Sequence, residues 1–213
     1  MKLAILDLGH FEYGAALAVQ QETLAAVQAG QAPDTLILVE HPAVITLGRN
    51  AQPENLLLTE EALARRGIAL KQTDRGGDVT YHGPGQLVGY PIFNIKARHG
   101  ASIRTFVENL ETVFIDLLRE QWQLPAGRSS CNSGVFIGND KILAIGLSVK
   151  RGVTMHGFAF NVTTDLSHYG AIVPCGLTDK GVTSLEAQTG RAIPLAEIKP
   201  LVAEGFRKQF GFE

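Results

Sequence analysis

Cysteine is scarce in this chain, which has two, Cys131 and Cys175. Two cysteines cannot build the disulfide framework of a small secreted domain. The chain also lacks a C-x-x-C pair and an H-E-x-x-H motif, and its six histidines are scattered. We therefore expect no metal site, no bound cofactor and no disulfide between the two cysteines.

Long apolar runs and an excess of one charge are also missing. No apolar run reaches the ~18 residues that a membrane span requires. The first residues, MKLAILDLGHFEYG, show no signal-peptide cleavage pattern. The formal net charge is −2, which gives no global attraction to nucleic acid. We expect a cytoplasmic protein that binds neither membranes nor nucleic acid.

What the chain does contain is typical of a globular domain. Hydrophobic residues make up 45% and charged residues 19% of its 213 residues. We find no internal repeat, low-complexity tract or linker. The sequence predicts a single domain spanning residues 1–213, with an α+β fold in which helices flank a mixed, mostly antiparallel sheet.

Periodicity predicts the main elements. A helix is expected at residues 13–29, and two more should follow N-caps at Thr59, where Gly67 ends the helix, and at Ser102. Two further helices are expected near 183–186 and from Leu195 onward. Pro200 should kink this last helix or start a new one. Strands are expected at residues 3–8, 35–40, 44–47, 68–73, 87–93, 135–137, 141–149 and 153–162. The last three strands, joined by tight turns, should form an antiparallel meander.

Residues 75–93 read RGGDVTYHGPGQLVGYPIF and contain five glycines and two prolines. Glycine lets the backbone adopt positive φ or lets another group approach it closely. Polar and titratable side chains at Arg75, Tyr81, His82 and Gln86 are interleaved with these glycines. This pattern indicates a loop that cradles a ligand and leads into a buried strand. An ordinary glycine-rich surface turn is an equal alternative from the residues alone.

Cys175 has the better setting for a nucleophile, because Pro174 stiffens its approach and the Gly176 N–H can help bind an oxyanion. A thiol has a pKa of about 8.5, and a neighbouring cation is needed to lower it. Lysines at strand ends, His82 and His156 are the candidates. The alternative for Cys175 is a buried small apolar residue. Cys131, in the polar segment RSSCNSG, ranks lower.

Three ordered segments carry a resemblance to a known family: RGGDVTYHGPGQLVGYPIF, KILAIGLSVKRGVTMHGFAFNV and VPCGLTDKGVTSL. Together they resemble the lipoyl(octanoyl) transferases, and the chain length and flanking helices fit as well. The resemblance implies the fold of the biotin/lipoate protein ligase catalytic domain. It also implies transfer of an octanoyl group from acyl carrier protein to a lysine of a lipoyl domain. The recipients are lipoyl domains of 2-oxoacid dehydrogenase complexes and the H protein of the glycine cleavage system.

The same resemblance assigns roles to residues. It implies that Cys175, in P-C-G, carries the acyl group as a thioester and that Lys141 is its paired lysine. The implied acyl-substrate contacts are Arg75, Gly76, Gly77, Asp78, Val79, Thr80, Tyr81, His82, Ala144, Ile145, Gly146, Gly157, Phe158 and Ala159. Position 78 is Asp here, whereas many members carry Gln, which makes Asp78 the weakest of these contacts.

Three other functions are alternatives. The first is an ATP-dependent lipoate or biotin protein ligase of the same fold, which would not need Cys175. The second is an amidotransferase that takes its octanoyl group from a lipoyl-domain protein. The third is a non-catalytic lipoyl-binding module, which would form no covalent adduct. We also expect a monomer, and a basic docking rim of Arg49, Arg75, Lys150 and Arg151 for the acidic protein substrates.

Overall fold

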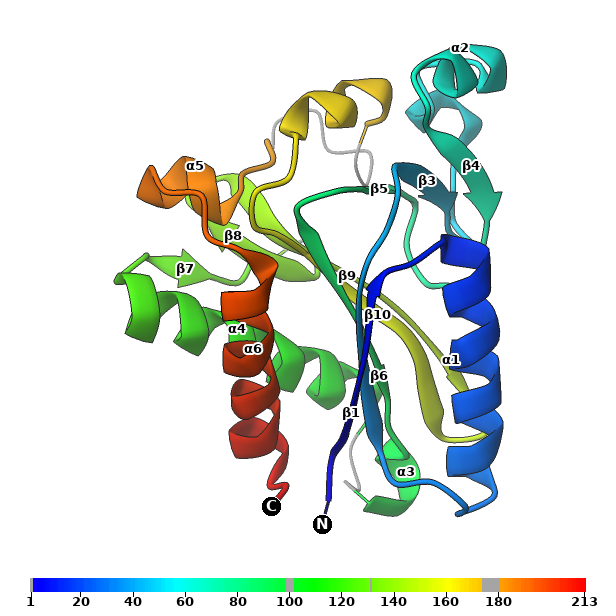
Figure 1. Cartoon of the computed structure of the whole chain (residues 1–213), viewed down its shortest axis with the longest axis vertical. Helices are drawn as coiled ribbons and strands as arrows, with labels where there is room; N and C mark the ends of the chain where they lie inside the picture. The colour runs from blue at the N-terminus through cyan, green and yellow to red at the C-terminus, as the bar shows by residue number, and fades with distance from the viewer. Residues whose placement is uncertain (1, 99–101, 131, 174–180) are drawn as a thin grey trace.

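Two sheets form the framework of the molecule (Figure 1). The computed structural model describes residues 2–98, 102–130, 132–173 and 181–213. The seven-stranded sheet contains, in spatial order, β1 (Ala4–His10), β2 (Thr35–Glu40), β6 (Gln86–Ile92), β10 (Val153–Asn161), β9 (Asp140–Lys150), β8 (Gly134–Ile137) and β7 (Ala126–Gly127). The three-stranded sheet contains β4 (Ala69–Gln72), β3 (Val44–Leu47) and β5 (Val79–His82).

Helices cover both faces of the large sheet (Figure 1). The helix α1 (Tyr13–Gln28) packs on one face, and α4 (Ile103–Trp122) and α6 (Leu195–Phe210) pack on the other. The shorter helices are η1 (Pro53–Asn55), α2 (Glu60–Arg65), α3 (Ile95–Arg98), η2 (Leu166–Ala171) and α5 (Leu185–Thr189). No helix in the described ranges is long and apolar enough to cross a membrane.

The strand β2 shows why the sheet is covered on both sides. Its residues Leu36 and Leu38 pack in the core shared with α4 and α6, whereas Ile37 and Val39 pack in the core under α1. Successive side chains of a strand point to opposite faces, so an unbroken apolar run needs a cover on each face.

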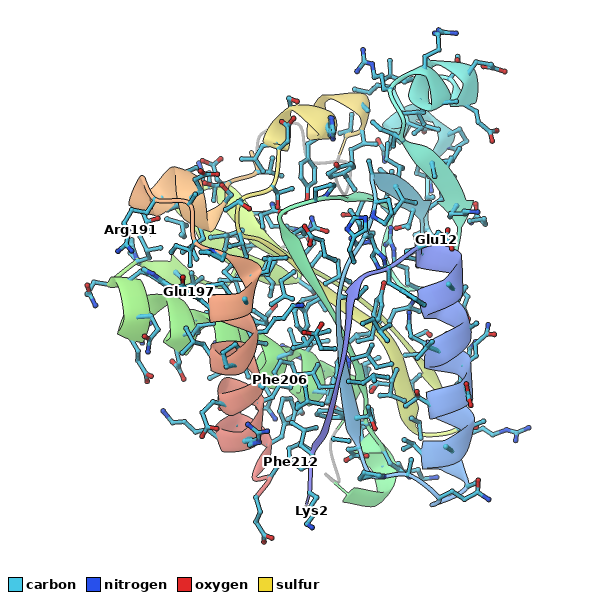
Figure 2. All side chains as sticks on the ribbon, viewed as in Figure 1. Lys2, Glu12, Arg191, Glu197, Phe206 and Phe212 are labelled. Carbon is cyan, nitrogen blue, oxygen red and sulfur yellow. The ribbon has the colours of Figure 1, made fainter. Side chains whose placement is uncertain are left out.

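Phenylalanines fill the core between the sheet and the C-terminal helix. Phe93 follows β6 and makes edge contacts with Phe106, Phe206, Phe210 and Phe212 at ring centroid distances of 5.8, 6.0, 5.4 and 5.3 Å. Phe206 and Phe212 lie between α6 and the sheet (Figure 2). The C-terminus is therefore part of the core.

Much of the expected architecture is confirmed. The fold is α+β with a mixed, mostly antiparallel sheet, and β8, β9 and β10 form the predicted antiparallel meander. The caps are confirmed too: Thr59 accepts a hydrogen bond from the Ala62 N–H at 3.3 Å, and Ser102 accepts one from the Thr105 N–H at 3.1 Å. These caps satisfy backbone donors that have no partner within the helix.

One expectation about the elements is wrong, and another is narrowed to one of its two alternatives. The glycine-rich segment is not all loop, because residues 79–82 pair with β3 as strand β5. Pro200 does not start a new helix, since α6 runs through it from Leu195 to Phe210. Pro200 is the sixth residue of the helix and cannot donate the hydrogen bond that another residue there would give to the Ala196 carbonyl, so α6 loses one bond and continues.

Candidate active site

A cavity lies on the α1 side of the large sheet, with strand β5 and the loop before it as its other wall. Its empty volume is ≈ 530 Å³, part of which is open to solvent. All the acyl contacts expected from the sequence line this cavity, except Gly76 and Tyr81. Lys141 lines it as well. The fold therefore brings together three segments that are far apart in the chain.

The floor of the cavity crosses three strands. Ala144 of β9 pairs with Ala159 of β10, and Ala159 pairs with Val88 of β6. In the next row, Gly146 pairs with Gly157. The floor residues of β9 and β10 in these rows are thus alanine or glycine, and larger side chains begin at β6. An apolar chain can lie flat across the first two strands.

Arg75 holds the loop above this floor. Its side chain is 7% exposed. Its Nε donates to the Thr46 hydroxyl at 3.1 Å, and its Nη2 donates to the carbonyl oxygens of Thr46 and Asp78, each at 2.7 Å. Its Nη1 donates to the Gly76 carbonyl at 3.1 Å. The guanidinium thus ties strand β3 to the loop, and it cannot belong to a docking rim on the surface.

Lys141 lies on β9, at the edge of the cavity floor. The side chain is 8% exposed, and its Nζ donates to the Asn132 side-chain carbonyl at 3.0 Å and lies 5.2 Å from the centroid of the Phe136 ring. Its backbone also pairs with the segment 181–183: the Lys141 N–H donates to Gly181 and its carbonyl accepts from Thr183, both at 3.0 Å. The ammonium is therefore held in place beside the cavity.

Cys175 lies outside the described residues, and so does Cys131. The pairing of Cys175 with Lys141 stays a prediction. The described residues closest in sequence to Cys175 are anchored: the Val173 N–H donates to Asn55 at 2.9 Å, and Gly181 pairs with Lys141 as above.

His82 lies at the other end of the cavity from the β9 floor. Its Nδ1 is 2.8 Å from the Gln86 side-chain carbonyl oxygen. The Gln86 amide nitrogen donates to Asn161 at 2.8 Å, so the Gln86 oxygen accepts and His82 Nδ1 carries the proton. Burial lowers the pKa of His82 to about 3, so the ring is neutral.

His156, which the sequence offered as a candidate cation beside Cys175, also lines the cavity. Its Nε2 is 2.7 Å from Asp74, whose other carboxylate oxygen accepts from Lys150 at 2.7 Å. Burial opposes charge on Asp74, but the hydrogen bonds from Lys150 and His156 outweigh it and lower its pKa to about 2. His156 has φ of +59°, which is uncommon for a residue other than glycine and is found at functional sites.

Three expected contacts have other surroundings. Tyr81 points away from the cavity, and its hydroxyl is 2.6 Å from His168 Nδ1. Gly76 packs against β9, where its N–H donates to the Leu147 carbonyl at 2.9 Å. Asp78 lines the cavity, but its carboxylate accepts from the Gln52 N–H at 3.1 Å and from the Asn55 amide at 2.5 Å. The Asp78 carboxylate therefore supports the loop around η1.

The structure does not support all four residues of the expected basic docking rim. Arg75 is buried, and Lys150 is paired with Asp74. Arg49 and Arg151 are exposed. Among the described residues, no group of three or more His, Cys, Asp or Glu side chains could hold a metal ion.

The sequence missed Tyr13, Val88 and Tyr90, which also line the cavity. Tyr13 looked like part of an amphipathic helix face, and Val88 and Tyr90 like residues of a buried strand. Nothing in a single sequence separates a side chain that packs on a core from one that packs on a cavity in that core.

The comparisons with known proteins agree with the fold. Residues 12–207 match the family model of the lipoyl protein ligase A/B catalytic domain. A lipoate-protein ligase A, solved with bound ATP, is similar with a TM-score of 0.80 and 16% identity, over 100% of this chain and 87% of that chain. The biotin protein ligase of Aquifex aeolicus is similar with a TM-score of 0.55 and 12% identity, over 99% and 69% of the two chains.

Full-length relatives share far more sequence. The chain is 52% identical over its whole length to an octanoyltransferase of Alkaliphilus metalliredigens, covering 97% of that protein. It is 47% identical over its whole length to an octanoyltransferase of Desulforamulus reducens, covering 93% of that protein. With this cavity, this fold and this identity over the entire length, the chain belongs to the octanoyltransferases of the lipoyl protein ligase A/B catalytic domain family.

Proposed function

We propose that this octanoyltransferase takes its acyl group from octanoyl-acyl carrier protein and passes it to a lysine of a lipoyl domain, through a thioester on Cys175. The observation that carries the proposal is the largely apolar cavity, whose floor on β9 and β10 is made of alanine and glycine and which the Lys141 ammonium borders at one end. Each buried methylene adds about 0.8 kcal/mol, so an eight-carbon chain gains useful binding energy there.

The proposed reaction has two acyl transfers. In the first, the Cys175 thiolate attacks the donor thioester, the new C–S bond forms, and the donor thiolate leaves with a proton from Lys141. In the second, the lysine amine of the acceptor attacks the Cys175 thioester and the C–S bond breaks. The nitrogen loses one proton as it becomes an amide, and Lys141 takes that proton, which restores the ammonium beside the Cys175 thiolate. Both transfers use sulfur as the leaving group, so the reaction needs no ATP.

Lys141 fits this role because it is held on several sides. Asn132 accepts from its Nζ, the Phe136 ring lies beneath it, and its backbone is paired on both sides of Val182. A positioned ammonium stabilises a nearby thiolate and gives its proton at a defined point. A lysine on a flexible surface loop would do neither as well.

Intact-mass spectrometry tests the proposal directly. After mixing with octanoyl-acyl carrier protein, without ATP or Mg²⁺, the protein should gain one octanoyl group. We expect this adduct to be absent in Cys175→Ala and present in Cys131→Ala. Adding a lipoyl domain should discharge the adduct and octanoylate the domain.

The matched variant at the lysine is Lys141→Met, which keeps the length of the side chain and removes its charge. We expect adduct formation to slow by at least a hundredfold, in the range of a lost acid-base group. Transfer that requires ATP would support the ligase instead. An adduct formed only from an octanoylated lipoyl-domain donor would support the amidotransferase, and no adduct from any donor would support a binding module.

A further inference from the structure

Four aromatic rings close the cavity at the end opposite Lys141. Tyr13 and His82 are stacked, with ring centroids 6.1 Å apart and planes at 13°. His41 lies behind them and contacts Tyr13, His82 and Tyr90 at centroid distances of 5.3, 6.0 and 6.0 Å. We refer to Tyr13, His41, His82 and Tyr90 as the end wall.

Most polar atoms of the end wall are already paired. His41 Nδ1 is 2.7 Å from the Phe11 carbonyl oxygen, to which it donates, so its Nε2 accepts from the Tyr90 hydroxyl at 2.7 Å. His82 Nδ1 donates to Gln86. His41 is 0% exposed and Tyr90 is 3% exposed, so these bonds lock the wall in position.

Two polar atoms of the end wall remain: the Tyr13 hydroxyl and His82 Nε2. Neither has a hydrogen-bond partner within residues 2–98, 102–130, 132–173 and 181–213, and neither is sealed from solvent. Both belong to side chains that are more than nine-tenths buried and line the cavity. Burial raises the pKa of Tyr13 to about 12 and lowers that of His82 to about 3, so the pair is a neutral donor and a neutral acceptor.

The end wall stands on the β6 side of the cavity, two strands away from β9. Lys141 is on β9 and Tyr90 is on β6, with β10 between them. Two strand spacings amount to about 10 Å across the sheet, and Lys141 also lies five residues before Gly146, whose row leads to Tyr90, so a chain that starts near Lys141 must run diagonally over the floor to reach the wall. Side chains rise from the floor at β6, where Val88 and Tyr90 replace the alanines and glycines of the first two strands.

We propose that the end wall limits the length of the acyl chain by hydrogen-bonding chemistry as well as by shape, an inference that rests on the proposed transfer reaction. An octanoyl chain ends before the wall and leaves the Tyr13 hydroxyl and His82 Nε2 in contact with water. A longer chain displaces that water and leaves a donor and an acceptor unpaired against its methyl end. Sites with such polar groups reject ligands that cannot satisfy them more strongly than apolar walls do.

The test compares octanoyl and decanoyl donors. Tyr13→Phe removes the hydroxyl and keeps the ring, so we expect the decanoyl-to-octanoyl ratio of kcat/KM to rise roughly tenfold, as for one buried polar group left unpaired. Tyr81→Phe is the matched control: it also removes the hydroxyl of a buried tyrosine, but one that points away from the cavity and lies 2.6 Å from His168 Nδ1. Its ratio should stay within about twofold of the wild type, since no cavity-facing polar atom changes.

The affinities for octanoate and decanoate, measured by calorimetry, provide a reading that needs no catalysis. The same shift in preference should appear in Tyr13→Phe. An unchanged ratio in Tyr13→Phe, or an equal rise in both variants, would overturn the proposal. If the wild type binds octanoate more tightly than decanoate but transfers no octanoyl group, the proposed role of the end wall would be supported and the proposed transfer reaction would be contradicted.

Discussion

At the scale of single residues, Arg75 organises the loop that forms one wall of the cavity. Its guanidinium donates to a hydroxyl and to three backbone carbonyl oxygens from β3 and from the loop itself. A planar guanidinium presents several donors in fixed directions, which a lysine ammonium cannot reproduce. The role of Arg75 is therefore to hold backbone atoms in place. Because the residue is buried, its positive charge does not form part of a surface that contacts a partner protein.

We predict that Arg75→Lys lowers the free energy of unfolding by about 2–3 kcal/mol, because several hydrogen bonds from a charged donor are lost and buried carbonyls lose their partners. Urea unfolding measures this loss. The exposed Arg49 supplies the control, and Arg49→Lys should change stability by less than about 0.5 kcal/mol. Equal stability of the two variants would contradict the structural role given to Arg75.

At the scale of elements, the low floor depends on how closely β6 and β10 approach each other. Gly157 has no room for a side chain: a Cβ there would overlap the Gly89 carbonyl oxygen and would lie 2.6 Å from Pro91 Cδ. A Cβ on Gly89 would in turn overlap the Phe158 ring. Glycine at these positions lets β6 and β10 pair closely.

Gly157→Ala should therefore destabilise the protein by about 3–4 kcal/mol, because backbone atoms of two paired strands would have to move apart. Gly170 in η2 is the matched control, since a Cβ there would meet nothing within 4 Å. Gly170→Ala should change the free energy of unfolding by about 0.5 kcal/mol or less. Thermal or urea unfolding of both variants compares them, and similar midpoints would show that the strand contact tolerates a methyl group.

At the scale of the whole molecule, buried histidines link stability to pH. Burial lowers the pKa of His41, His82 and His156, although hydrogen bonds and nearby carboxylates partly oppose the shift at His41 and His156. Their neutral forms persist in the folded chain below pH ~6.5, where the unfolded chain takes up protons. The unfolded state then binds more protons, so stability falls as the pH falls.

We predict that the free energy of unfolding declines between pH 6.5 and pH 5 by up to about 1.4 kcal/mol per pH unit for each such histidine. His82→Gln removes one titrating group, so its stability should fall less steeply over the same range. Parallel pH profiles for His82→Gln and the wild type would show that His82 is not held neutral.

Much of the fold followed from the sequence because local rules decided it. Thr59 and Ser102 were recognised as caps, and the glycine and asparagine turns predicted the meander of β8, β9 and β10. The family motifs predicted contacts that line one cavity with Lys141. These features depend on a residue and its near neighbours in the chain, so a single sequence contains them.

Other features were decided only by tertiary contacts. Strand β5 exists because β3 pairs with it, although the glycines around it favour a loop. Arg75 is buried because β3 supplies acceptors for it, and Tyr13 meets His82 only when α1 packs near β5. The sequence by itself determined the family and the main elements other than β5, whereas β5, the end wall and the loop support arise from residues distant in the chain, whose contacts no local pattern encodes.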